Sequence, residues 1–186
     1  MKSPTDVLRD EHTIILRGLD LLGAAADRPE AGAAPPDGWW EEVLGWLRAF
    51  ADRNHHAKEE DLLFPALINA GVPAEGGPID VMLEEHAQGR ALVRAMAESR
   101  GAARAAKARE YVALLRAHID KENGVVFPLA DAVLDDAEQR ALASAFTAVE
   151  SEPGRGVSVG DAAMVVEGFG AMLGGQQLVV AARAVG

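Results

Sequence analysis

Hydrophobic residues recur every three or four positions along most of this chain, which is the spacing of one face of an α-helix. The first such run begins at Ser3, whose side chain can cap a helix, and Pro4 suits the first helical turn. It continues to about Ala26, where the Pro- and Gly-rich residues 27–38 interrupt the pattern. We therefore predict a first helix from Ser3 to Ala26, followed by a loop.

The same spacing predicts four more helices. They extend from Asp37 or Gly38 to Ala70, from Pro78 to Arg100, over residues 101–134, and from a cap at Asp135 or Asp136 to Glu150. Pro65 lies inside the second helix of the chain and Pro128 inside the fourth, so we expect a kink at each. The glycine-rich residues 151–186 fit a helix only in places, which leaves open whether they pack on the other helices or mediate self-association, for example in a homodimer.

The composition agrees with a helical protein. Aliphatic residues are abundant, only 5% of residues are aromatic, and the β-branched residues form no alternating runs that would indicate strands. A length of 186 residues is enough for one ordinary domain with a hydrophobic core. We therefore predict an all-α fold.

Charge and cysteine content exclude several functions. The 29 acidic residues against 18 Lys and Arg give a net charge of -11, which opposes nonspecific binding to nucleic acid or anionic membranes. The absence of cysteine excludes disulfides, thiol nucleophiles and iron–sulfur clusters, so any metal ion must bind nitrogen and oxygen ligands. Neither a signal-like apolar run nor about 18 consecutive apolar residues occurs, so we expect a soluble, cytoplasmic protein.

Two stretches of the chain read alike: HHAKEEDLLFPALI, which begins at His55, and HIDKENGVVFPLAD, which begins at His118. Both carry a lysine three positions after the histidine, a glutamate four positions after it, and a Phe-Pro pair after nine and ten positions. Two further histidines, His12 and His86, each follow a pair of acidic residues. The first 130 residues therefore read as two copies of a helix pair, with a longer loop in the first copy.

Each of these four histidines lies on the hydrophobic face of its predicted helix, and Glu59 and Glu122 lie one turn after two of them. A lone histidine on an apolar face is usually a core residue, and a lone His-x-x-x-Glu is often a surface pair. Neither explains the duplicated set, because buried carboxylates without a partner cost several kcal/mol or become protonated. The candidate metal ligands are His12, His55 and Glu59 from the first copy, and His86, His118 and Glu122 from the second.

Imidazole and carboxylate ligands suit iron, manganese, zinc or copper, and carboxylates that can bridge favour two metal ions between helices. The motifs, their order and their spacing resemble the hemerythrin-like family, also called the HHE cation-binding domain, over about residues 5–135. The resemblance implies an antiparallel up-down four-helix bundle over residues 1–135. Beyond the resemblance, we expect residues 136–186 to form a helix and a glycine-rich helical extension that pack on the bundle. The resemblance also implies a centre of two non-haem iron ions, bridged by Glu59 and Glu122 and completed by the four histidines, although zinc or manganese would also suit these ligands.

The chain departs from the oxygen-carrying members of that family in two places. Those proteins have a second histidine one turn after the first on the third helix, where this chain has Arg90. They also have an aspartate at a longer spacing on the fourth helix, where this chain has Glu122. The centre would lack one nitrogen ligand and leave a metal position open, which suits reactions with small molecules as well as reversible binding.

His56 and Glu60 form a second His-x-x-x-Glu in the first copy. We prefer His55 with Glu59, because this pair keeps the distance to Phe-Pro that the second copy shows. We therefore expect His56 at the rim of the site or on the surface.

Three other residues have two interpretations each. Glu11 and Glu85 fit solvent-exposed helix faces, and alternatively accept hydrogen bonds from metal-bound histidines. Tyr111 fits the core, and alternatively donates a hydrogen bond to a bound oxygen species.

Several functions fit such a centre. It could bind oxygen, nitric oxide or peroxide, or it could act as an enzyme that reduces peroxide or nitric oxide. It could also serve in iron storage or in the repair of iron centres, or hold zinc or manganese as a structural site. The sequence does not separate binding from turnover, and it assigns no catalytic residue.

Overall fold

A computed structural model describes residues 2–28, 34–152 and 156–184, with side chains up to residue 174. Within these ranges the chain forms helices joined by short connections and contains no strand, so the all-α prediction is confirmed. None of the described helices is long and apolar enough to cross a membrane.

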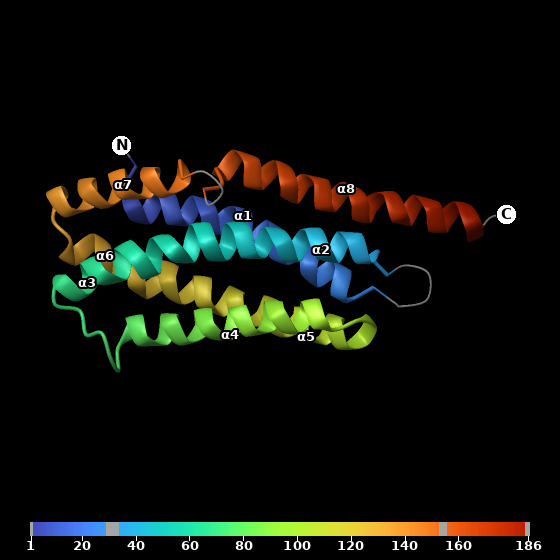
Figure 1. Ribbon diagram of the computed structural model, residues 1–186, viewed down its shortest axis with the longest axis horizontal. Helices are drawn as coiled ribbons and strands as arrows, with labels where there is room; N and C mark the ends of the chain where they lie inside the picture. The colour runs from blue at the N-terminus through green and yellow to red at the C-terminus, as the bar shows by residue number, and fades with distance from the viewer. Residues whose placement is uncertain (1, 29–33, 153–155, 185–186) are drawn as a thin grey trace.

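Four long helical segments form an antiparallel up-down bundle, in which each segment runs opposite to the one before it (Figure 1). The first is α1 (Pro4–Ala26) and the third is α4 (Pro78–Glu98). The second segment, residues 37–69, is made of α2 (Asp37–Trp46), η1 (Leu47–His56), η2 (Glu59–Leu63) and α3 (Phe64–Asn69). The fourth, residues 101–133, is made of α5 (Gly101–Lys121), η3 (Glu122–Val126) and α6 (Phe127–Val133).

The helices begin where the sequence predicts them. The backbone N–H of Asp6 donates a hydrogen bond of 3.1 Å to the Ser3 hydroxyl, which caps α1, and α4 begins at Pro78. Asp135 caps α7 (Asp136–Glu150) in a capping box with Glu138. Local side-chain chemistry therefore sets these helix starts, before any tertiary contact is considered.

The two interior prolines each follow a widened, π-helical turn. The backbone N–H of Phe64 bonds the carbonyl of Glu59, five residues back, and Phe127 bonds Glu122 in the same way. A proline ring clashes with the carbonyl four residues before it, and a wider turn relieves that clash. Glu59 and Glu122 therefore lie at the points where the second and fourth segments are widened.

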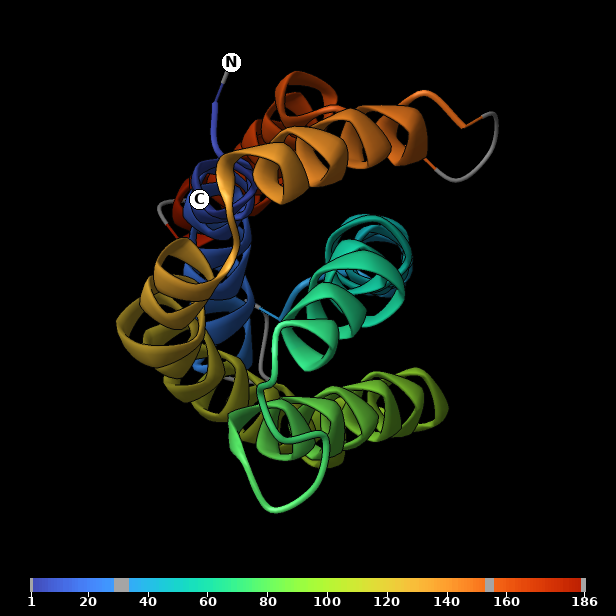
Figure 2. The ribbon, with the colours of Figure 1, turned by 90° about the vertical axis from the view of Figure 1, so that its left-hand side faces the viewer.

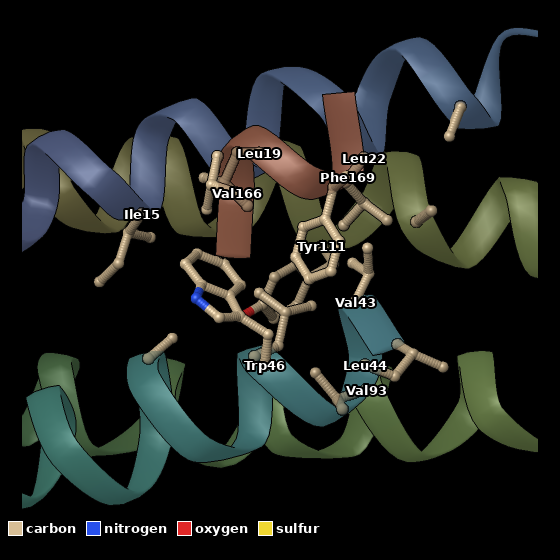
Figure 3. Close-up of a cluster of buried hydrophobic side chains, with 14 of the residues drawn as sticks. Ile15, Leu19, Leu22, Val43, Leu44, Trp46, Val93, Tyr111, Val166 and Phe169 are labelled. Atoms are coloured by element: carbon tan, nitrogen blue, oxygen red, sulfur yellow. The ribbon is translucent and has the colours of Figure 1, made fainter. Parts of the chain in front are cut away.

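Two hydrophobic clusters fill the bundle, with a polar layer between them. One cluster surrounds the aromatic residues Trp39, Trp46 and Tyr111 (Figure 3), and the other surrounds Phe64 and Phe127. Each segment contributes to both clusters, and the first three carry their buried histidines between the two contributions; on the fourth, Ile119 of the first cluster directly follows His118. On α1, for example, Leu8 and Ile15 belong to different clusters and His12 lies between them.

The chain beyond residue 135 packs outside the bundle. Helix α7 crosses the end that contains Phe64, and α8 (Val159–Ala184) lies along α1 and α2 (Figures 1 and 2). Residues Val166 and Phe169 of α8 are buried against Leu19, Leu22 and Trp46 (Figure 3). Residues 159–184 form one helix, although their sequence fits a helix only in places. The division into domains at residue 135 stays a prediction.

Candidate metal centre

The polar layer brings the six candidate ligands together. Their ligand atoms form two groups, within each of which all atoms lie within 4.8 Å of one another. The first group comprises His12, His55, Glu59 and Glu122, and the second comprises His56, Glu59, His86 and His118. Every one of these side chains is buried.

Each group contains a pair of histidines from neighbouring segments. In the first group, Nε2 of His12 lies 3.0 Å from Nε2 of His55. In the second, Nε2 of His86 lies 3.0 Å from Nε2 of His118. Two nitrogen ligands that each bind one metal ion at about 2.1 Å, at an angle near 90°, lie about 3 Å apart, so both pairs have a spacing that fits a shared ion.

The two glutamates lie between the groups. Glu122 directs one oxygen to His12 and the other to His118, each at a distance of 3.1 Å. Glu59 directs one oxygen to His55 at 3.6 Å and the other to His86 at 3.5 Å. Each carboxylate thus reaches one histidine of each group, which is the placement that a bridging ligand requires.

The outward-facing Nδ1 atom of each of the four histidines has a hydrogen-bond partner on another segment. His55 is held by Glu11 at 2.9 Å and His118 by Glu85 at 3.0 Å. The other two histidines also have partners on another segment. Nδ1 of His86 lies 2.7 Å from a Glu60 oxygen, and Nδ1 of His12 lies 3.1 Å from the side-chain oxygen of Asn123.

These partners fix the protonation of the rings. Carboxylate and amide oxygens accept hydrogen bonds, so each Nδ1 carries the hydrogen and each Nε2 of a neutral ring presents a lone pair. In both histidine pairs the two Nε2 atoms lie 3.0 Å apart. All four oxygens of Glu59 and Glu122 are also buried without a hydrogen-bond partner. Acceptors that converge in this way fit a site for cations.

The pKa values of the two buried glutamates move in opposite directions. Burial raises the pKa of Glu59 well above its usual value, and the neighbouring Glu122 raises it further. Burial also acts to raise the pKa of Glu122, but contacts with His118 and His12 outweigh it and lower this pKa well below its usual value. Without a cation, the two neighbouring carboxylates therefore favour a state in which the pair shares one proton.

The expected place of His56 at the rim or on the surface is wrong. Its side chain is buried, and its ring stacks on His86 with a centroid distance of 3.8 Å. The π-helical form of η1 explains the difference, because a wider turn rotates successive residues by less than the 100° of an α-helix and so brings His55 and His56 to the same side. Glu60, in contrast, stays outside the ligand groups, where it binds His86 and Arg90.

Glu11 and Glu85 are not solvent-exposed charges. The Glu11 side chain is fully buried and that of Glu85 is 14% exposed, and both accept hydrogen bonds from histidines. The sequence signal for this role was their position directly before the two lone histidines in both copies. Tyr111 lies in the hydrophobic cluster, where burial raises the pKa of its phenol.

The sequence did not predict a role for Lys58. Its side chain is fully buried, and it forms a close ion pair with Glu11 and a hydrogen bond of 2.7 Å to Glu150 at the end of α7. Asn54 also donates to Glu11, at 3.0 Å, and accepts from the backbone of Val157 at 3.3 Å. The part of the chain beyond residue 135 therefore supports the partner of His55.

One comparison with known proteins gave a match. The family model described as the hemerythrin HHE cation binding domain matches residues 3–130. No curated protein and no solved structure matches the chain. The matched range contains all six candidate ligands and His56, and it ends before α7.

Proposed function

The chain belongs to the hemerythrin HHE cation-binding family, and we propose that it is a non-haem di-iron protein that binds or reacts with oxygen, peroxide or nitric oxide. The observation that carries this proposal is the convergence of His12 with His55, and of His86 with His118, at 3.0 Å between their Nε2 atoms beside two buried carboxylates. Buried imidazole and carboxylate groups that meet in this way are suited to binding cations.

The donor set fits two iron ions. His12 and His55 would hold the first ion, His86 and His118 the second, and Glu59 and Glu122 would lie between them. Imidazole nitrogen with carboxylate oxygen is a usual set for iron in helical bundles. When bound, the iron ions would supply redox chemistry and positions for small ligands.

The residues around the ligands would prepare them for the metal. Glu11, Glu60, Glu85 and Asn123 hold a hydrogen on Nδ1, which leaves Nε2 available and increases its basicity where the partner is a carboxylate. The hydrophobic clusters above and below the polar layer close it off from water at the two ends of the bundle. Loss of the proton from Glu59 would accompany metal binding, since a coordinating carboxylate must be ionised.

The test is anaerobic reconstitution of the full chain with ferrous iron, followed by metal counting and optical spectra after addition of oxygen, peroxide or nitric oxide. We expect about two iron ions per chain and a spectral change with at least one oxidant. Glu122→Gln should lose iron. Glu110→Gln is the matched control, because Glu110 is exposed and pairs only with Lys107.

Fewer than about one iron ion per chain would contradict the di-iron proposal. Preferential retention of zinc, with no spectral response, would support a structural metal site instead. Repeated consumption of peroxide or nitric oxide in the presence of a reductant would identify an enzyme. A stable adduct formed once per centre would identify a binding protein.

A further inference from the structure

A cavity of about 150 Å³ lies beside the second ligand group, between the second segment and α4. It has room for several water molecules or for a small ion. Its lining is formed by Leu47, Arg48, Asp52, His56, Gly89, Arg90, Val93, Arg94 and Tyr111. His56 belongs to the second ligand group, so the cavity reaches the candidate metal centre on that side.

The cavity wall carries an excess of positive charge. Three arginines line it against a single carboxylate, that of Asp52. Arg90 is already neutralised, because it donates hydrogen bonds of 2.9 Å to both Asp52 and Glu60. Arg48 and Arg94 are exposed at the cavity and form no hydrogen bond or ion pair with the residues that the structure describes. In a chain with a net charge of -11, two such cations around one cavity favour an anion there.

Two buried polar groups complete the lining. Nδ1 of His56 is buried and lies 3.7 Å from an Asp52 oxygen, and it has no partner within hydrogen-bond distance in the described part of the chain. The Tyr111 side chain is only 3% exposed, and its hydroxyl forms no hydrogen bond within the same part. Gly89, on α4, leaves the space open, because a methyl group there would touch only the Tyr111 ring, at 3.6 Å. The cavity thus offers donors of a kind that a small polar ligand would use.

The side of the centre near His55 is different. There the Lys58 side chain is fully buried, and Glu150 of α7 covers it. The corresponding lysine of the second copy, Lys121, is 42% exposed, and among the described residues it pairs with Glu85 alone. The two ligand groups therefore differ in what surrounds them: α7 encloses the first, and the arginine-lined cavity adjoins the second.

We propose that this cavity binds a small oxyanion, of the size of nitrite or bicarbonate, through Arg48, Arg94 and the Tyr111 hydroxyl. The inference deepens the proposed function, on which it rests for the metal ions, because it places a ligand of stated chemistry beside the second group. Guanidinium groups are suited to oxyanions, since their donors match two oxygens at once. Arg90 and His86 share Glu60 as a hydrogen-bond partner. An anion near Arg90 would therefore affect the hydrogen bond that holds His86.

The test is calorimetric titration of the zinc-loaded full chain with sodium nitrite, where zinc keeps the sample free of redox reactions. We expect saturable binding of one nitrite per chain. Arg94→Ala and Arg48→Ala should each weaken the affinity about tenfold, which corresponds to one lost charge-assisted hydrogen bond. Arg140→Ala is the matched control: Arg140 is exposed on α7, so the net charge changes equally while the cavity does not, and less than about twofold is expected.

A second series tests the location of the anion. Gly89→Ala narrows the cavity and Gly89→Leu fills it, so the affinity should fall in that order, with folding checked by thermal unfolding. Absence of saturable nitrite binding overturns the inference whatever the metal content. Nitrite binding that is unchanged in Arg94→Ala and Gly89→Leu also overturns it. The metal count of the same samples tests the proposed two-metal centre independently of the anion site.

Discussion

Lys58 and Glu150 connect the bundle to the chain beyond it. The fully buried ammonium of Lys58 donates a hydrogen bond of 2.7 Å to the Glu150 carboxylate and also pairs with Glu11, which holds His55. A chain of polar contacts therefore leads from the end of α7 to a candidate metal ligand. Its outer end lies beyond residues 3–130, the range that the family model matches.

The Glu150→Gln variant tests this chain of contacts. The substitution keeps an oxygen that can accept from Lys58 but removes one of the two negative charges beside the buried ammonium, so we expect the free energy of unfolding to fall by about 1 to 3 kcal/mol. Metal held by His12 and His55 should also be extracted faster by a chelator. Urea unfolding measures the first effect. The kinetics of metal extraction by a chelator, with two phases for the two halves of the centre, measure the second. Glu110→Gln, which breaks an exposed ion pair with Lys107, should change the free energy of unfolding by no more than about 0.5 kcal/mol and leave extraction unchanged.

The Glu59→Gln variant should separate stability from metal binding. Because the pKa of Glu59 is raised, its ionised form destabilises the metal-free fold as the pH rises above the usual value of 4.5. A glutamine there stays neutral and can donate to Glu122, so the metal-free variant should be about 1 to 3 kcal/mol more stable at pH 7. Below pH 4.5 the difference should vanish.

The same variant should bind fewer metal ions than the wild type, since glutamine cannot act as an anionic bridge. Unfolding of the metal-free wild type and variant across pH measures the difference in stability. Metal counting measures the difference in metal binding. A metal-free variant that is less stable than the wild type at pH 7 would show that Glu59 has a structural role instead.

His56→Gln should affect only one half of the centre. His56 belongs to the group of His86 and His118, so its loss should accelerate extraction of one metal ion and leave the other phase unchanged. Glu150→Gln should accelerate the other phase, which is the extraction of the metal ion held by His12 and His55. Two-phase chelator kinetics on both variants and on their combination would show this; equal acceleration of both phases by His56→Gln would place His56 elsewhere.

Gly18→Ala tests the packing of α1 on the aromatic cluster. A methyl group at Gly18 would approach two ring atoms of Trp46 to 2.6 Å, which forces a shift in a packed core, and a loss of about 1 to 3 kcal/mol is expected. Gly23, on the same helix, has open space around it, so Gly23→Ala should raise stability by about 0.5 to 1 kcal/mol. Urea denaturation of both variants measures the contrast.

The helices up to residue 150 and the six candidate ligands could be predicted from the sequence, because they depend on local patterns. Helix starts follow from caps such as Ser3 and Asp135, and the inward face follows from the spacing of apolar residues. The repeat of His-x-x-x-Glu with Phe-Pro selected His55 and Glu59 over the neighbouring pair. The structure brings both of these residues into the polar layer.

Only the tertiary structure decided how the centre is surrounded. The partners of His55 and His118 lie on other helices, and the pairs of His12 with Asn123 and His86 with Glu60 span the two copies. No local pattern encodes such distances, since they depend on how the helices pack.

The burial of His56 and the contact of Lys58 with Glu150 also appeared only in three dimensions. The first depends on a π-helical turn that changes the phase of the helix, and the second on where α7 crosses the bundle. The sequence by itself determined the six candidate ligands, because a repeat and a period are properties of the chain. What distinguishes its two halves was decided by packing, because that difference arises between segments far apart in the chain.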